Sequence, residues 1–208
     1  MVLCIFAIEA DREAELREMG VRDSKVLTAE KREYLAKELR KIGDYALVSV
    51  SASALTTAMR RRMTLNELEA REISGLLVEL VGGKVAIKKV FVDSPDPVPR
   101  KFELRIRRYC DHAFEIVCEH KADSKYAVVG AASIIAKVER DAAMDKIRKV
   151  MRECGVKDEL GSGYSHDVVT IDFLKKHSRL PALQDYIRHE WETAKRLKTE
   201  QVDLGKFI

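Results

Sequence analysis

The sequence predicts an α/β protein in which helices cover a sheet. Short apolar runs rich in β-branched residues alternate along the chain with longer segments whose leucines recur at helical spacing. Glycine and proline lie between these segments, and 46% of the 208 residues are hydrophobic, enough to bury a core. No apolar run approaches the ~20 residues of a membrane span, and no basic leader opens the sequence. We therefore expect a cytoplasmic protein.

The first half of the chain predicts strands and helices in alternation. Residues 2–8 (VLCIFAI) and 46–52 (ALVSVSA) are typical of strands. The segment 28–43 between them has leucines at helical spacing, a threonine at its start and a glycine at its end, which predicts a capped helix. A second leucine-rich helix is expected over 64–83, where two glycines end it. Residues 85–93 then predict a strand that ends in an aspartate, before the turn Ser-Pro-Asp-Pro.

The second half predicts mostly helices around one further strand. In order, these are a basic helix over about 99–110, a strand over 113–119, a helix from about 131 to 155, a glycine-rich loop over 161–167, and helices over about 168–177 and 182–199. In α/β sheets, ligands bind where loops leave the strand ends. The ends of the strands at 93 and 119 are therefore the places to look for a site.

The net charge and the cysteines say less about function than the order of predicted strands and helices does. The net charge is +4, and basic residues cluster at Arg60, Arg61 and Arg62 and again at Arg100, Lys101, Arg105, Arg107 and Arg108. Such clusters suit a polyanion such as nucleic acid, but they are equally typical of solvated helix faces. The four cysteines form no CxxC pair, so neither a zinc knuckle nor a redox motif is indicated, and we expect reduced, mostly buried thiols.

Two aspartates stand at neighbouring strand ends. Asp93 closes the strand over 85–93, and Asp123 lies just beyond the strand over 113–119. Carboxylates that converge at one rim repel each other unless a cation lies between them, and oxygen ligands favour Mg²⁺ or Mn²⁺ over zinc. The alternative is that Asp93 opens the Ser-Pro turn and Asp123 caps the following helix, both common roles for aspartate.

Several motifs resemble one known family. GVRDSKVL, LNELEA, FVDSPDPVP, EHKADSKYAVVGAASIIAKVERD and GSGY occur in the order found in the type 2 ribonuclease H (ribonuclease HII) family, archaeal-like, and the similarity runs from about Val2 to RHEWETA. The resemblance implies a ribonuclease H-like mixed sheet flanked by helices, with a catalytic domain over 1–160 and a substrate loop with a C-terminal helical part over 161–208. It also implies an endonuclease that hydrolyses the RNA strand of RNA–DNA hybrids, including embedded ribonucleotides, with Mg²⁺ or Mn²⁺.

The resemblance also assigns residues. Asp93 in VDSPD and Asp123 in HKAD match catalytic, metal-binding carboxylates, and Tyr164 in GSGY matches the residue at the 2′-hydroxyl and deoxyribose of an RNA–DNA junction. Without the surrounding GSG, a loop tyrosine packed on the core would be the simpler reading. The positions expected around the substrate backbone are Asp23, Ser24, Lys25, Asn66, Lys121, Ser133 and Lys137.

The chain departs from the family pattern at its start. The family's first strand carries an Asp-Glu pair and a glycine-arginine-glycine loop, and we expect that strand to be missing here because Met1 is not the biological start. Glu9 and Asp11 lack the adjacent acidic pair and the glycines, so we interpret them as a solvated acidic loop. Further departures are His166, expected to be an exposed loop residue, and Glu192, which follows Trp191 where the family tends to have a basic residue.

Three readings follow: an active hybrid-cleaving ribonuclease, a catalytically silent protein that binds hybrids, and an inactive fragment of the enzyme. The expected partners are RNA–DNA hybrid or DNA containing ribonucleotides, with no membrane. The C-terminal VDLGKFI has the ending of a short peptide that docks on a sliding clamp, although a disordered tail explains it equally well. A monomer is the family expectation.

Overall fold

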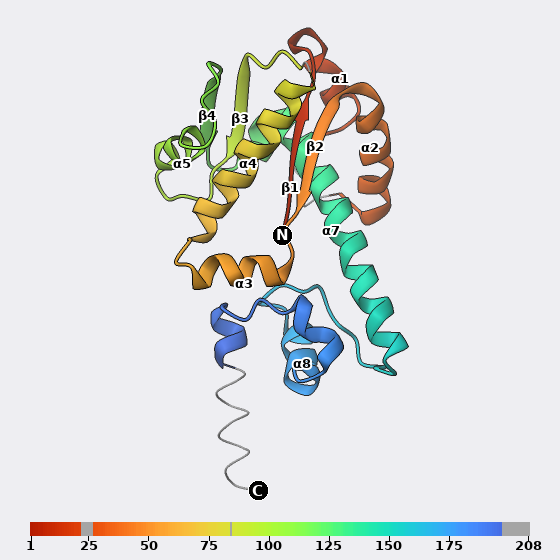
Figure 1. The fold of residues 1–208 in the computed structure, drawn as a ribbon. Coiled ribbons are helices and arrows are strands. Elements are labelled where there is room, and N and C mark those ends of the chain that lie inside the picture. The colour runs from red at the N-terminus through yellow and green to blue at the C-terminus, as the bar shows by residue number, and fades with distance from the viewer. Residues whose placement is uncertain (22–26, 84, 197–208) are drawn as a thin grey trace, which may run out of the picture. The chain divides into compact units, whose positions relative to one another are not determined.

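The computed structural model describes residues 1–21, 27–83 and 85–196 (Figure 1). The chain forms two compact units, each built from several segments. The first contains Met1 with residues 50–63 and 141–208, and the second contains residues 2–49 and 64–140. The predicted division at residue 160 stays a prediction.

In the larger unit, strands β1 (Val2–Ala7) and β2 (Asp44–Ser49) form an antiparallel ladder in which Val2 pairs with Ser49. Residues at odd positions of β1, such as Ile5, pack on helix α4 (Leu65–Gly82), whereas Phe6 packs on the opposite side. Because successive side chains of a strand point to opposite faces, a strand covered on both faces needs a continuous apolar run. The run at 2–8 meets this need, and β1 is confirmed.

The Phe6 side of β1 is covered by α2 (Ala29–Ile42), α1 (Glu13–Glu18) and the first half of α7 (Ala127–Glu153). The predicted cap of α2 is present, since the Thr28 hydroxyl accepts a hydrogen bond from Lys31 N at 3.2 Å. Gly43 ends the helix for a different reason from the predicted one. Its φ of −146° suits any residue, but a Cβ there would lie 2.4 Å from Cζ of Phe6.

The other half of this unit contains β3 (Lys89–Asp93) and β4 (Glu115–Glu119), which pair in parallel. Helices α4 and α5 (Pro99–Arg107) lie beside this ladder (Figure 1). They cover one of its faces, with Phe102 and Ile106 fully buried in the cluster that contains Val90, Val92 and Ile116 of the strands. Ile5 of β1 also packs against this cluster. The predicted mixed character is therefore present as one antiparallel and one parallel ladder, which are not hydrogen-bonded to each other within the described residues.

The smaller unit is helical. It contains α3 (Ala52–Arg60), the second half of α7, α8 (Val168–His177) and the 3₁₀ helix η2 (Pro181–Tyr186). Its core gathers Met151, Phe173 and Leu183 among other apolar residues. Thr56 of α3 accepts a hydrogen bond from His189 N at 3.2 Å, which joins α3 to the segment after η2.

The structure differs from the predicted elements at several places. Helix α3 and the short α1 were not predicted, the strand expected from residue 85 begins at Lys89, and α7 begins at Ala127 instead of about 131. In the described part of the helix expected over 182–199, the structure has η2 and a separate helical stretch at 192–196.

All four cysteines lie in described segments and are free thiols, but the expectation that they are mostly buried is wrong, since only Cys110 is buried, Cys4 and Cys118 are half-buried and Cys154 is exposed. Burial raises the pKa of Cys4 and of Cys118 to about 12, so both stay protonated. None of the described helices combines the length and the apolar character needed to cross a bilayer.

Candidate active site

Asp93 is the last residue of β3, and its side chain is exposed at the rim of the parallel ladder. The hydrogen bonding between the two chain segments continues one residue past β3, because Ser94 N donates to Glu119 O at 2.9 Å. Asp93 Oδ1 accepts a hydrogen bond from Ala122 N at 3.1 Å. The structure therefore brings the Asp93 carboxylate to the residue directly before Asp123.

Asp123 lies in the four-residue helix α6 (Ala122–Lys125) and is only 7% exposed. Lys121, and not Asp123, occupies the N-cap position of this helix, so Asp123 does not cap it. Ser124 Oγ lies 3.5 Å from Asp123 Oδ1. A buried carboxylate is costly unless cations or hydrogen-bond donors compensate it.

The end of α6 is held against β4 and β3 by several contacts. Tyr126 OH donates to Glu119 Oε1 at 3.0 Å, and Lys125 forms an ion pair with the same carboxylate. The Tyr126 ring also stacks on Phe91 of β3 with 4.1 Å between centroids. These contacts hold α6 against both strands and fix the position of Asp123.

Lys121 has a left-handed backbone conformation, with φ of 57° and ψ of 37°. This region costs a residue with a Cβ roughly 1–2 kcal/mol, and glycine adopts it freely. The turn that leads into Asp123 therefore depends on a strained backbone.

We expect Lys121→Gly to exceed Lys121→Ala in free energy of unfolding by about 1 kcal/mol, since both variants lose the charge but only glycine relieves the strain. Urea denaturation of the two variants measures the difference. The matched control is Lys125, within α6, where glycine should instead be the less stable variant by about 1 kcal/mol. Equal stabilities for the two Lys121 variants would contradict the strain.

The other residues expected at the substrate backbone are distributed over the larger unit. Asn66 lies in the first turn of α4, where its Nδ2 donates to Asp96 Oδ1 at 2.7 Å. Ser133 and Lys137 are half-buried and lie four residues apart on one side of α7. Asp23, Ser24 and Lys25 lie outside the described residues.

Tyr164 lies in the smaller unit and is 48% exposed, so it does not pack on the core. Its ring stacks on His166 with 5.6 Å between centroids, which shows that the predicted exposed loop histidine has an aromatic partner. Gly161, which begins the loop, has φ of +74°, and a Cβ there would lie 2.6 Å from Thr170 Oγ1. The glycine is therefore required by both conformation and space.

Asp167 holds this loop closed, a role that the sequence reading did not assign. Its Oδ2 accepts hydrogen bonds of 2.6 Å from both the hydroxyl and the backbone N–H of Ser162, and its Oδ1 accepts from Val169 N at 3.1 Å, capping α8. The bonds from the Ser162 hydroxyl and N–H lower the pKa of Asp167 well below its usual range. An aspartate at the start of a predicted helix was the available signal.

A lowered pKa stabilises the fold at any pH above the pKa of the unfolded chain, about 3.9, and this stabilisation is lost as pH falls below it. We expect Asp167→Asn to be less stable than the wild type at neutral pH, with a difference that shrinks toward pH ~2. Urea denaturation across this range measures it. Asp172→Asn, on the exposed side of α8, is the control, and a difference that does not change with pH would refute the assignment.

The residues that were not expected to act in the site are Glu9, Asp11, Trp191 and Glu192. Asp11 lies in the 3₁₀ helix η1 (Ala10–Arg12) and Glu9 directly precedes it, both exposed. Glu192 is exposed, and Trp191 lies under the Arg188 guanidinium, 4.5 Å from the ring centroid. Among the residues that the structure describes, no three His, Cys, Asp or Glu side chains come together as possible metal ligands.

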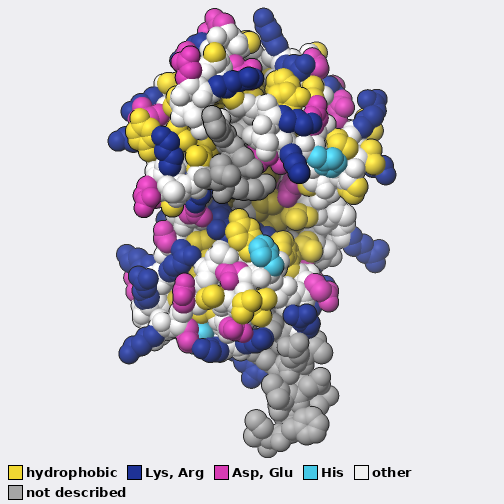
Figure 2. All heavy atoms as spheres, turned by 180° about the vertical axis from the view of Figure 1, so that it is seen from behind, with side chains coloured by type: hydrophobic (Ala, Val, Ile, Leu, Met, Phe, Trp, Pro, Cys, Tyr) yellow, Lys and Arg dark blue, Asp and Glu magenta, His cyan; other side chains and the backbone are white. Residues whose placement is uncertain are grey.

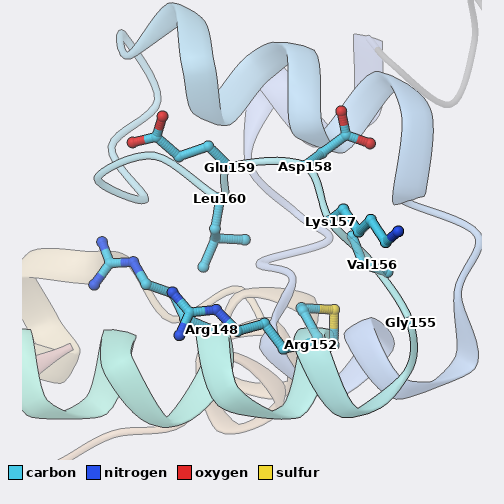
Figure 3. A pocket seen from close by; sticks show the side chains of 9 residues that line it. Arg148, Arg152, Gly155, Val156, Lys157, Asp158, Glu159 and Leu160 are labelled. Atoms are coloured by element: carbon cyan, nitrogen blue, oxygen red, sulfur yellow. The ribbon is translucent and has the colours of Figure 1, made fainter.

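A separate pocket of 460 Å³ lies beside the end of α7 in the smaller unit and contains none of the predicted site residues. Figure 3 shows Leu160 pointing toward Arg148 and Arg152 of α7, while Asp158 and Glu159 point the other way. Arg148 Nη2 donates to Gly161 O at 2.8 Å and so joins α7 to the loop that contains Tyr164.

The two basic clusters are partly neutralised by ion pairs. Arg60 Nε lies 2.9 Å from Glu190 Oε1, Arg105 bridges two carboxylates, and Arg107 pairs with Glu103 at 3.2 Å. On the face shown in Figure 2, Lys and Arg side chains of the described residues are interspersed with Asp and Glu side chains. Charge alone therefore does not locate a nucleic-acid surface on this face.

Comparison with known proteins gives one consistent family. The family model described as Ribonuclease HII matches residues 1–194. The ribonuclease HII of Methanocaldococcus jannaschii is 38% identical over 221 residues, covering 98% of this chain and 91% of the relative. That of Methanothermobacter thermautotrophicus is 39% identical over 183 residues, covering 88% of this chain and 84% of the relative.

Solved structures agree with the sequence relatives. The ribonuclease HII of Archaeoglobus fulgidus, solved in complex with PCNA, superposes with a TM-score of 0.78 at 34% identity and covers 95% of this chain and 88% of its own. The ribonuclease H2 of Pyrococcus horikoshii superposes with a TM-score of 0.73 at 31% identity, covering 96% and 98%. The predicted fold class is thereby confirmed, and the chain belongs to the ribonuclease HII family.

Proposed function

We propose that this chain is an endonuclease that hydrolyses the RNA strand of RNA–DNA hybrids, including ribonucleotides embedded in DNA, with the help of a divalent metal ion. Its relatives are ribonucleases HII, which supports ribonuclease H chemistry. The observation that carries the proposal is the hydrogen bond from Ala122 N to Asp93 Oδ1, which holds the Asp93 carboxylate on the backbone of the residue directly before the buried Asp123.

Asp93 and Asp123 suit a hard divalent cation. Mg²⁺ is commonly bound in proteins by one or two carboxylates, with water and substrate phosphate oxygens completing its ligands. Asp93 is exposed and so is accessible to substrate, while Asp123 is buried. Bound there, Mg²⁺ or Mn²⁺ would supply Lewis-acid stabilisation of charge at the phosphoryl group.

The remaining side chains act on the nucleic acid. Lys121, Ser133 and Lys137 are donors suited to phosphate oxygens, which position a strand without reading its bases. Tyr164 presents a hydroxyl and an aromatic face to solvent, beside His166. Because RNA and DNA backbones differ at the 2′-hydroxyl, a donor or acceptor at that point is what discriminates between them.

The test is incubation of the chain with an end-labelled RNA–DNA hybrid in Mg²⁺ or in Mn²⁺. We expect internal cleavage of the RNA strand only, with no product from the matching DNA duplex and none in chelator. Hybrid binding by the folded chain without any cleavage would replace the proposal with the silent hybrid-binding reading. Failure of the folded chain both to bind and to cleave would favour the inactive fragment.

The proposal includes a sliding-clamp partner that binds the C-terminal segment 202–208, which lies outside the described residues. The support is the likeness to the Archaeoglobus fulgidus ribonuclease HII, which was solved in complex with PCNA. We expect deletion of residues 202–208 to abolish binding to an archaeal PCNA and to leave cleavage of a short hybrid unchanged, as measured by calorimetry and the cleavage assay. Unchanged clamp affinity would refute this assignment. Cytoplasmic localisation and a monomeric state remain predictions.

A further inference from the structure

The turn that follows β3 is held by a buried network of side chains. Asp96 lies in this turn between Pro95 and Pro97 and is 5% exposed. Asn66 Nδ2 donates to Asp96 Oδ1 at 2.7 Å, and Arg105 Nε donates to Oδ2 at 2.9 Å. Both carboxylate oxygens of Asp96 thus accept hydrogen bonds from protein side chains. This arrangement is typical of a carboxylate that stabilises a turn and not of an exposed ligand.

Arg105 connects this turn to the first turn of α4. Its Nη1 donates to Glu67 Oε2 at 2.5 Å, and Glu67 Oε1 accepts from Tyr109 OH at 2.8 Å. Burial acts to raise the pKa of Glu67, but hydrogen bonds from Tyr109 and Arg105 lower it overall, so the carboxylate is ionised. A planar guanidinium that bonds two carboxylates through separate N–H groups fixes the orientation of both.

The other side of the turn contacts the segment that leads to Asp123. Ser94 N donates to Glu119 O, and the Nδ1 of His120 lies 3.3 Å from Ser94 O. Two residues after His120, Ala122 N donates to Asp93 Oδ1. The turn therefore lies between the Asp96 network and the hydrogen bond that joins the two carboxylate segments.

We propose that Asp96 and Arg105 are positioning residues, which hold the turn after β3 so that the Asp93 carboxylate stays on the backbone N–H of Ala122. Neither residue touches substrate or metal; both act through Asp93. The effect on catalysis rests on the proposed function, whereas the effect on the Asp93–Ala122 hydrogen bond does not.

The test is Asp96→Asn, which preserves the size of the side chain. A carboxylate accepts from both Asn66 and Arg105, but a carboxamide has one acceptor and turns its NH₂ group toward one of these donors. We expect faster hydrogen exchange at the Ala122 amide and a kcat for hybrid cleavage that is lower by about 10- to 100-fold, with KM unchanged. Arg105→Lys should behave in the same way, because a single ammonium does not reproduce the two directed bonds.

The matched control is Glu103→Gln, which also converts a carboxylate to an amide, but whose carboxylate pairs with Arg107 of the same helix, α5. It should leave the Ala122 exchange rate and kcat at wild-type values. An unchanged Ala122 exchange rate in Asp96→Asn would overturn the proposal, as would faster exchange at all amides, which indicates general unfolding. If the wild type does not cleave hybrids, the proposed function fails, and the Ala122 exchange rate alone decides the positioning role.

Discussion

Asp123→Asn is expected to lower the rate of hybrid cleavage by about a thousandfold, while the affinity for the hybrid changes little. Asparagine keeps the shape of the buried side chain but removes the negative charge that attracts a cation. A Lewis-acid metal contributes several kcal/mol to the stabilisation of charge at the reacting phosphoryl group, and each 1.4 kcal/mol corresponds to a factor of ten in rate. Single-turnover cleavage and fluorescence-anisotropy binding measure the two quantities separately.

The control for this change is Asp111→Asn, an exposed aspartate in the segment between α5 and β4. It should cleave at the wild-type rate. Thermal unfolding of Asp123→Asn must also be recorded, because removing charge from a buried site can raise stability. Wild-type cleavage by the folded Asp123→Asn variant would show that Asp123 is not part of the catalytic site.

Phe102→Ala is expected to lower the free energy of unfolding by about 3–5 kcal/mol, the largest stability effect that we predict. Phe102, on α5, is 0% exposed and packs against α4 and the strands that carry Asp93 and Glu119. Truncation removes the buried ring and leaves a cavity that the surrounding helices fill only in part. Urea denaturation followed by circular dichroism measures the change.

Leu104→Ala is the matched control, since Leu104 lies two residues further along α5 and is 49% exposed. It should change stability by less than about 0.5 kcal/mol, because surface substitutions away from special features rarely exceed that. Similar losses for Phe102→Ala and Leu104→Ala would mean that α5 does not pack on the ladder as described.

Sequence reasoning located best the strands and helices whose residues indicate both the type of element and the positions where it begins and ends. The apolar run of β1 is continuous because both of its faces are covered, and the Thr28 hydroxyl caps α2 as its position suggested. Helix α3 was missed because ASALTTAMR follows a strand directly and contains small and β-branched residues that occur equally in strands. Its cap, Ser51, was read as part of that strand.

The places of Asp93 and Asp123 in the fold were predictable from the sequence, but the hydrogen bonds and ion pairs around them were not. Placing Asp93 and Asp123 at strand ends follows from the alternation of elements, and the structure joins their segments through Ala122. The network around Asp96 was not predicted, because an aspartate between two prolines in a turn is typical whether it is exposed or buried. Its partners Asn66 and Arg105 lie 30 residues before it and 9 residues after it in the sequence. The residues next to Asp96 therefore do not indicate that these contacts form.

The path of the chain through the two units determines how the protein can be divided. Helix α7 is a single helix whose residues 127–140 belong to the larger unit and whose residues 141–153 belong to the smaller one. The smaller unit also takes in residues 50–63, so neither unit is a continuous stretch of sequence. A gene fragment ending at residue 140 would cut the helix and leave its last carbonyl groups without helical partners. Functional dissection of this protein therefore calls for point substitutions in the whole chain, not for separate expression of its halves.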